Sequence, residues 1–308
     1  MSGLTLYSAE GRRTWAWVAV PLAWLFVFAA ARLAEFVAGL VGLHASGASG
    51  RWQDNIVALF AWGLVLLILW AWLKYRERRS LRTIGLPRGW GRFGGGFALG
   101  AVIVVLVVAG EVALGGYTID GPGAWYDHLT PTWLFATILV LIGTVLQASV
   151  MEALFRGWLM QTVAAKWGRE LAVLLSVLLF ASIQAGDVMR APEAMLGVAN
   201  LGLLAWLLAQ VVLRNNALWV ACGLNAAWRL VTGLGFGLNI DGYHLNVTPM
   251  LLAIGDNPEA PWWLTGGDFG PDGSVLMTLI LGAMLLMTRR GGRRHRRERD
   301  DDDDDFME

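Results

Sequence analysis

The apolar run at residues 132–158 ends in the stretch Glu152-Ala153-Leu154-Phe155-Arg156-Gly157. On an α-helix, Glu152 and Arg156 lie four residues apart on one face, so their charges can pair. Ionisable side chains inside a lipid-spanning helix are costly, and they usually face the protein interior or a wet cavity. We therefore expect this turn to mark a functional site. The structural alternative is a pair at the membrane surface, with the Arg156 side chain reaching up to the lipid head groups.

The composition of the chain is that of a membrane protein. Of its 308 residues, 56% are hydrophobic and 16% are charged, and the mean hydropathy is +0.53. A soluble domain carries about 25% charged residues. Tryptophans stand at the ends of apolar runs, as an aromatic belt at the membrane interfaces requires: Trp15, Trp17, Trp52, Trp133, Trp219 and Trp262. These features predict a polytopic membrane protein and exclude a soluble globular domain.

Eight apolar runs are candidates for membrane spans, each of which needs about 20 mostly apolar residues. They lie at residues 15–43, 55–73, 93–114, 132–158, 170–186, 195–213, 217–238 and 274–288. The first run contains Arg32 and Glu35, which can pair on one helix face. No small-residue cleavage site follows it, so we expect a retained anchor. The predicted fold is all-α, a polytopic membrane helix bundle of about eight transmembrane helices.

The charges of the loops predict the orientation of the chain in the membrane. Lys and Arg accumulate in short loops on the cytoplasmic side. Residues 74–92 contain seven basic side chains, whereas residues 115–131 and 239–273 contain none. With eight spans, the basic segments all fall on one side together with both termini. We therefore expect an integral membrane protein with both termini in the cytoplasm.

The chain divides into three predicted parts. Residues 1–79 are expected to form an N-terminal transmembrane hairpin, residues 80–288 a membrane core, and residues 289–308 a charged cytoplasmic tail without fixed structure. The tail begins with an arginine-rich stretch, and such a stretch beside a span favours anionic lipid. Membrane lipid is therefore an expected partner, and nucleic acid is not. Small residues let spans pack closely, so we expect close helix contacts at Gly94, Gly95, Gly96 and Gly100.

A sparse set of polar side chains interrupts the spans after residue 130. Each costs free energy in hydrocarbon unless it is hydrogen-bonded, so we expect these residues to converge. Asn225 and Arg229 share one helix face, as Glu152 and Arg156 do. For Gln147 and Asn200 we expect interhelical hydrogen bonds, worth about 0.6 kcal/mol each. The full set is Gln147, Glu152, Arg156, Gln184, Asn200, Asn225 and Arg229.

Three short motifs on successive spans resemble one family of intramembrane peptidases. They are the stretch at 152–157, Phe180-Ala181-Ser182-Ile183-Gln184, and residues 218–229. In order and spacing they resemble the CAAX protease and bacteriocin-processing (CPBP or Abi) family, whose pattern is Glu-Glu-x-x-x-Arg-Gly, Phe-x-x-x-His and His-x-x-x-Asn or Asp. Residues 81–86 and 263–274 extend the resemblance to roughly residues 80–288. It implies an intramembrane endopeptidase in which a first-motif glutamate, assisted by histidine, activates water.

This sequence departs from the family pattern at four motif positions. Met151 stands at the first glutamate, Gln184 at the second-motif histidine, Asn225 at the third-motif histidine and Arg229 at the final Asn or Asp. Carboxamides cannot shuttle a proton near neutral pH and are poor ligands for a transition metal. The four histidines, His44, His128, His244 and His295, lie outside the motifs. We therefore expect neither a cofactor nor the metal ion that active relatives can hold.

The resemblance and these departures together favour a catalytically degenerate CPBP-like protein of a bacterial inner membrane that binds a membrane protein, a hydrophobic or prenylated peptide, or a lipid. Arg156 and Arg229 would hold an anionic group of the ligand. The structural alternative is that Arg229 only neutralises Glu152 and locks two spans together. Two other functions remain: an active intramembrane endopeptidase that uses Glu152 as its base, and a small transporter-like protein. The paired broken spans typical of transporters are not found in the sequence.

Overall fold

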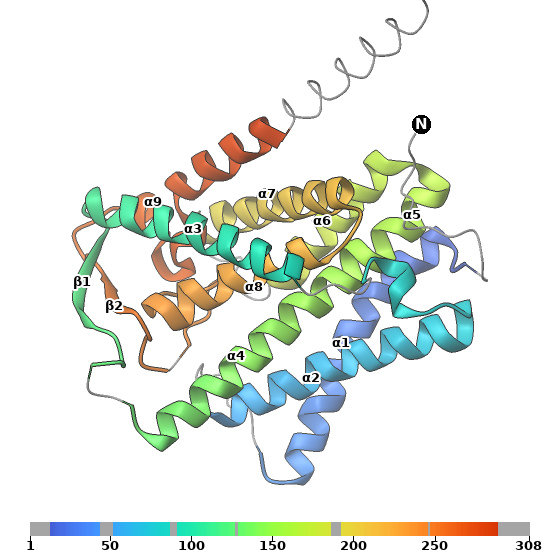
Figure 1. The fold of residues 1–308 in the computed structure, drawn as a ribbon, viewed down its shortest axis with the longest axis horizontal. Coiled ribbons are helices and arrows are strands. Elements are labelled where there is room, and N and C mark those ends of the chain that lie inside the picture. Colours follow the sequence, from blue (N-terminus) through green and yellow to red (C-terminus); the bar gives the residue numbers. More distant parts are fainter. Residues whose placement is uncertain are drawn as a thin grey trace, which may run out of the picture.

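A computed structural model shows a bundle of helices with one small two-stranded sheet (Figure 1). It describes residues 13–43, 52–86, 91–126, 129–185, 192–245 and 247–288. The tail at 289–308 and three of the histidines, His44, His128 and His295, lie outside the described residues. The helices are α1 (Ala16–Leu40), α2 (Trp52–Ala71), α3 (Gly91–Ala113), α4 (Pro131–Glu152), α5 (Met160–Trp167), α6 (Arg169–Ala185), α7 (Pro192–Asn215), α8 (Trp219–Arg229), α9 (Trp262–Thr265) and Val275–Thr288. The predicted all-α membrane helix bundle is confirmed.

The predicted number of eight membrane spans is only partly supported by the helix lengths. Within the described residues, five helices are long and apolar enough to cross a membrane: Ala16–Leu40, Gln53–Glu77, Gly91–Ala113, Pro131–Trp167 and Ala194–Asn215. The other three apolar runs coincide with shorter helices, α6 of 17 residues, α8 of 11 residues and Val275–Thr288. A full crossing needs about 20 residues. The count of eight spans is therefore not confirmed.

In the described part of the chain, three π-helical segments interrupt the regular helices. Trp72–Glu77 extends α2, Ala153–Leu159 joins α4 to α5, and Leu230–Gly235 extends α8. The second begins directly after Glu152 and the third directly after Arg229. Every residue of Ala153–Leu159 is buried, so this segment lies at the centre of the main hydrophobic core. π-Helical turns often occur at functional sites. The position of two of them directly after Glu152 and Arg229 therefore marks these residues as candidate functional residues.

Glycines allow α3 and α8 to pack closely. A Cβ added at Gly96 or Gly100 would collide with backbone atoms of α8, and one added at Gly223 of α8 would collide with the backbone of α3. The predicted close contacts are therefore confirmed for Gly96 and Gly100. They are wrong for Gly94 and Gly95, since a Cβ there would have no described neighbour within 4 Å. This packing fixes the helix that carries Asn225 and Arg229.

A short antiparallel sheet joins the two loops that contain no Lys or Arg. Strand β1 (Tyr117–Pro122) pairs with β2 (Leu252–Asp256), with Tyr117 opposite Asp256. Both strands lie at one end of the bundle, on the left of Figure 1. The Tyr117 hydroxyl also donates to the backbone oxygen of Thr265. The sheet holds the long connection after α8 against the bundle, and that connection carries part of the site.

A buried carboxylate connects the N-terminal helices to the segment that contains Arg156. Oε1 of Glu77 accepts hydrogen bonds from the Thr14 hydroxyl at 2.5 Å and from Trp158 Nε1 at 3.0 Å. Its Oε2 lies 3.5 Å from Nη1 of Arg79. Glu77 is fully buried, and a hydrogen-bonded network of this kind fixes the relative position of the helices that share it. The burial of Glu77 was not predicted, because this residue stands at the end of a span among basic residues.

Candidate functional site

The predicted pair of Glu152 and Arg156 forms, and it lies in the protein interior. Oε1 of Glu152 accepts from Arg156 Nη1 at 3.1 Å and from Asn225 Nδ2 at 3.0 Å. Neither side chain of the ion pair has any solvent exposure. The alternative in which Arg156 reaches the membrane surface is therefore wrong. The pair and Asn225 form one compact group, which we call the Glu152 cluster.

Both terminal nitrogens of Arg156 bind other parts of the protein. Its Nη2 donates to the backbone oxygen of Ala205 in α7 at 3.1 Å, and its guanidinium carbon lies 4.2 Å from the centre of the Phe180 ring in α6. A cation over an aromatic ring is attracted by the ring quadrupole, more strongly where water is excluded. Arg156 thus connects three helices, and Met151 beside it is fully buried. The arginine is placed to hold helices together.

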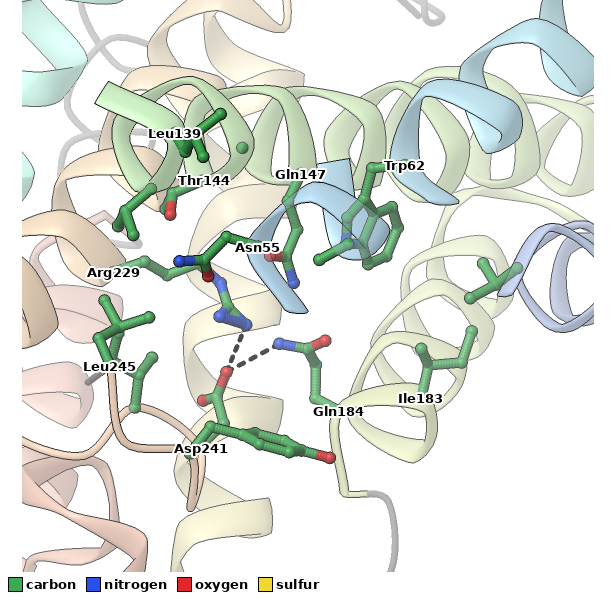
Figure 2. A pocket seen from close by; sticks show the side chains of 16 residues that line it. Asn55, Trp62, Leu139, Thr144, Gln147, Ile183, Gln184, Arg229, Asp241 and Leu245 are labelled. Carbon is green, nitrogen blue, oxygen red and sulfur yellow. Dashed lines mark hydrogen bonds and ion pairs between the residues drawn. The ribbon is translucent and has the colours of Figure 1, made fainter. Parts of the chain in front are cut away.

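Gln184 and Arg229 form a second group around a carboxylate from a loop. Oδ2 of Asp241 accepts from Gln184 Nε2 at 2.8 Å and from Arg229 Nη2 at 2.5 Å (Figure 2). The alternative in which Arg229 neutralises Glu152 is therefore wrong. Asp241 follows α8 in the connection that folds back over the bundle, and it supplies the nearer negative charge. We call these three residues the Asp241 cluster.

The Asp241 cluster lines a cavity of about 400 Å³. Figure 2 shows the side chains around this space, which belong to α1, α2, α4, α6, α8 and the connection after α8. A polar cavity of this size holds water. Among the described residues, its lining does not include Glu152 or Asn225. The polar lining side chains are Asn55, Thr144, Gln147, Gln184, Arg229, Asp241 and Tyr243, and apolar walls come from Trp62, Leu139, Ile183 and Leu245.

A second carboxyl group, that of Asp272, lies behind the cavity. Its Oδ2 accepts from the backbone N–H of Asp241 at 3.3 Å, and its Oδ1 accepts from Trp228 Nε1 at 2.7 Å. Burial raises the pKa of Asp272 to about 7, and the charge of Asp241 acts in the same direction. Burial also raises the pKa of Asp241, against the opposing effect of Arg229 and Gln184. Asp272 belongs to the stretch 263–274 that contributed to the family resemblance.

The two residues expected to form interhelical hydrogen bonds behave differently. Nδ2 of Asn200 donates to the backbone oxygens of Asp272 at 2.9 Å and Ser274 at 3.0 Å, and its Oδ1 accepts from the Thr278 hydroxyl at 2.8 Å. The expected role of Asn200 is therefore confirmed. Gln147 instead lines the cavity and makes no hydrogen bond to another described residue, so its expected role is wrong.

Glu111 is a further buried acid that the sequence analysis did not select. It is fully buried in α3, and neither of its carboxyl oxygens makes a hydrogen bond of normal geometry within the described part of the chain. The signal that marks Glu152, an acid inside an apolar run, also applies to Glu111 in the run 93–114. Glu152 was selected because a basic residue stands four positions away. Glu111 has no such partner and was therefore not selected.

The side chains at the motif positions do not fit the metal ion of active relatives. They are a thioether, two carboxamides and a guanidinium, from Met151, Gln184, Asn225 and Arg229. Among the described residues, no group of three His, Cys, Asp or Glu side chains is arranged to hold a metal. His244 is exposed, with Nδ1 3.1 Å from Oδ1 of Asn239. No catalytic step through a metal follows from this arrangement.

Comparison with known proteins identifies the segment that carries the Glu152 cluster and, from the Asp241 cluster, Gln184 and Arg229. Residues 131–231 match the family model Rce1-like, described as type II CAAX prenyl endopeptidase Rce1-like. No curated protein and no solved structure matches the chain. The matched segment runs from α4 to the π-helical turn after α8, and it includes Glu152, Gln184, Asn225 and Arg229. The predicted resemblance is thereby confirmed: residues 131–231 of this membrane helix bundle are similar to the type II CAAX prenyl endopeptidase Rce1-like family.

Proposed function

We propose that this CPBP-type membrane protein is a catalytically degenerate relative of the endopeptidases, and that its cavity binds a peptide segment without cleaving it. One observation carries the proposal. The groups that face the cavity are carboxamides, hydroxyls and a closed ion pair, whereas the motif carboxylate Glu152 is sealed in the interior. The bound segment is a hydrophobic peptide or part of a membrane protein.

The arrangement disfavours hydrolysis. A general base must lie within hydrogen-bond reach of the water that it activates. Glu152 has no exposed surface, and its Oε1 is held by Arg156 and Asn225. The carboxylate in the cavity wall is that of Asp241, whose Oδ2 is occupied by Gln184 and Arg229. The histidines that assist the reaction in the family are replaced by carboxamides, which cannot carry a proton near neutral pH.

The chemistry of the cavity suits a peptide backbone. Carboxamides offer both donors and acceptors, as Asn55, Gln147 and Gln184 do here, and these match the N–H and C=O groups of a peptide. The apolar walls suit hydrophobic side chains, in the usual manner of a binding site. Arg229 is neutralised by Asp241, and Arg156 belongs to the Glu152 cluster. The ligand expected from the sequence, an anion held by both arginines, is therefore replaced by an uncharged segment.

Binding and cleavage are tested on the same purified protein. A fluorescent hydrophobic peptide with an amidated C-terminus is titrated with the protein in detergent, and mass spectrometry follows its integrity. We expect saturable binding and an intact peptide. Gln147→Leu should weaken binding about five- to tenfold, because a lost hydrogen bond inside a site costs about 1 kcal/mol or more. The matched control is Gln53→Leu, on α2 outside the cavity lining. Equal loss in both variants, or no binding, contradicts the proposal.

The second candidate function is an active endopeptidase with Glu152 as its base. One observation favours it: Oε2 of Glu152 has no hydrogen-bond partner among the described residues. That oxygen would have to accept a proton from a water molecule reaching the interior. Prenylated and unprenylated peptides are incubated with wild-type protein and with Glu152→Gln. Cleavage by the wild type that disappears in the variant would establish this function in place of binding alone.

A further inference from the structure

A second hollow, distinct from the cavity, lies among α6, α7 and the helix Val275–Thr288. It has a volume of about 540 Å³, within the range of small-molecule binding sites. Its apolar walls come from side chains of all three helices: Val173, Leu174, Val177, Trp206 and Leu285. Its polar lining comes from one end of these helices: Arg169 and Glu170 begin α6, Gln210 lies near the end of α7, and Thr288 ends the last helix. We call this hollow the α6–α7 groove.

The polar end of the groove carries one positive and one negative side chain. Arg169 and Glu170 are both exposed, and within the described part of the chain neither forms an ion pair. The two charges therefore remain available to a ligand. A guanidinium binds phosphate oxygens well, and a carboxylate accepts hydrogen bonds from an ammonium group. The groove mouth complements a ligand that carries a phosphate and an amine together.

The sequence places this end of the bundle at the head-group level of the membrane. Lys166 lies in the last turn of α5, Arg169 begins α6, Arg214 lies in the last turn of α7, and an arginine-rich stretch follows Thr288. Such basic segments lie on the cytoplasmic side of spans. Moving from Arg169 along α6, the groove lining becomes apolar at Val173 and Val177. Head-group chemistry at the mouth thus continues into walls suited to an acyl chain.

We propose that the α6–α7 groove binds one phospholipid whose head group contains a phosphate and a primary amine, the phosphoethanolamine class. Arg169 binds the phosphate, and Glu170 accepts hydrogen bonds from the ammonium. One acyl chain lies along Leu174, Val177 and Trp206. An anionic head group without an amine would leave Glu170 facing a negative charge, and a quaternary amine would offer it no N–H donor. The site is independent of the peptide cavity and of its proposed function.

The test measures lipid binding to the full chain in detergent by native mass spectrometry. Phosphatidylethanolamine is compared with phosphatidylglycerol and phosphatidylcholine of the same acyl chains. We expect phosphatidylethanolamine to bind about five- to tenfold more tightly than either of the other lipids, because it forms one additional charge-assisted hydrogen bond. Equal or tighter binding of phosphatidylglycerol overturns the proposal. Free phosphoethanolamine tests the head group without its acyl chains. If this compound displaces the lipid completely, the proposed acyl-chain contact is wrong.

Two variants assign the preference to the groove. Glu170→Gln should remove the preference for phosphatidylethanolamine over phosphatidylcholine, whereas Arg169→Gln should weaken all three lipids about fivefold. The matched control is Lys166→Gln, an exposed basic residue at the same end that does not line the groove. Leu174→Trp fills the groove without changing a charge and should abolish tight binding. An unchanged preference in Glu170→Gln, or equal effects of Arg169→Gln and Lys166→Gln, overturns the proposal.

Discussion

The Glu152 and Asp241 clusters use similar side chains in opposite surroundings. Asn225 and Arg229 stand one turn apart on α8, and each belongs to a different cluster. The ion pair of the Glu152 cluster has no exposure, and its arginine also binds a carbonyl oxygen and an aromatic ring. In the Asp241 cluster, the exposed fractions of the arginine and aspartate side chains are 12% and 5%, and both line a cavity.

Under the proposed function, this difference separates a structural role from a ligand-binding role within one set of motif residues. The family pattern assigns all these positions to a single catalytic centre. In this chain the Glu152 cluster joins α4, α7 and α8 and offers no surface to a ligand. The carboxylate of the Asp241 cluster comes from a loop, and the cluster faces a cavity that is large enough for a ligand. Substitutions in the first cluster should therefore change stability, and substitutions in the second should change binding.

The largest effect is expected for Arg156→Leu. Removing one partner of a buried ion pair leaves the other charge without compensation, at a cost of about 3–5 kcal/mol. Glu152 would keep only its hydrogen bond from Asn225. Thermal unfolding of the purified protein, followed by tryptophan fluorescence, should show a strongly lowered midpoint.

Two controls separate burial from the mere loss of an arginine. Arg32→Leu breaks a pair with Glu35 at 2.9 Å whose side chains are 62% and 47% exposed, and it should cost about 1 kcal/mol or less. The double variant Glu152→Gln with Arg156→Leu removes both charges and should recover part of the lost stability. If Arg156→Leu were as mild as Arg32→Leu, the structural role of the Glu152 cluster would be refuted.

A smaller effect, on ligand choice, is expected for Asp241→Asn. This variant retains an acceptor for Gln184 but leaves Arg229 without its negative partner. The cavity would then favour anions, and a peptide with a free C-terminal carboxylate should bind about tenfold more tightly than to the wild type. The amidated peptide should bind with nearly unchanged affinity. Fluorescence anisotropy with both peptides measures the ratio.

The control for this variant is Asp268→Asn, which removes an exposed acid from the same connection, outside the cavity lining. It should leave the ratio of the two affinities unchanged. Because the experiment depends on the proposed peptide binding, failure of both peptides to bind would count against that function. Equal binding of both peptides to Asp241→Asn would instead show that Arg229 does not control ligand charge.

The parts of the molecule that follow from local patterns could be predicted from the sequence. Apolar runs placed the long helices within a few residues, since burial in lipid imposes length and composition directly. The spacing of Glu152 and Arg156 predicted their ion pair, because a helix brings such positions together whatever surrounds it. Arg32 and Glu35 pair for the same reason. The strand Tyr117–Pro122 was not predicted, because its alternation of apolar and polar residues covers only Tyr117 to Asp120 and ends at a Gly-Pro turn signal.

The remainder of the site depends on contacts between distant segments. Arg229 pairs with Asp241 because the connection after α8 folds back across the bundle, and no periodic pattern in that connection predicts its path. The separation of Asn225 from Gln184 follows from the same fold, although both stand at histidine positions of one motif set. Spacing along the chain establishes which residues share a helix face. It does not establish which faces enclose a cavity.

The smallest effect is a dependence of stability on pH through Asp272, behind the Asp241 cluster. Its pKa is raised from the ordinary value of 3.8 to about 7, chiefly by burial. The folded protein therefore retains a proton that the unfolded chain has already lost, so this contribution is present at low pH and disappears as the pH rises through about 7. Between about pH 6 and pH 8 the loss is on the order of 1 kcal/mol.

The comparison of wild type with Asp272→Asn isolates this contribution, because other titrating groups are common to both proteins. The asparagine oxygen can still accept from Trp228, but it cannot titrate. The thermal midpoint of the wild type should fall by a few degrees over this pH interval relative to that of the variant. Parallel pH profiles would show that Asp272 does not hold a proton in the folded state. In that case Asp272 would carry a second negative charge beside Asp241. The two charges together would bind Arg229 more tightly than the proposed peptide binding requires.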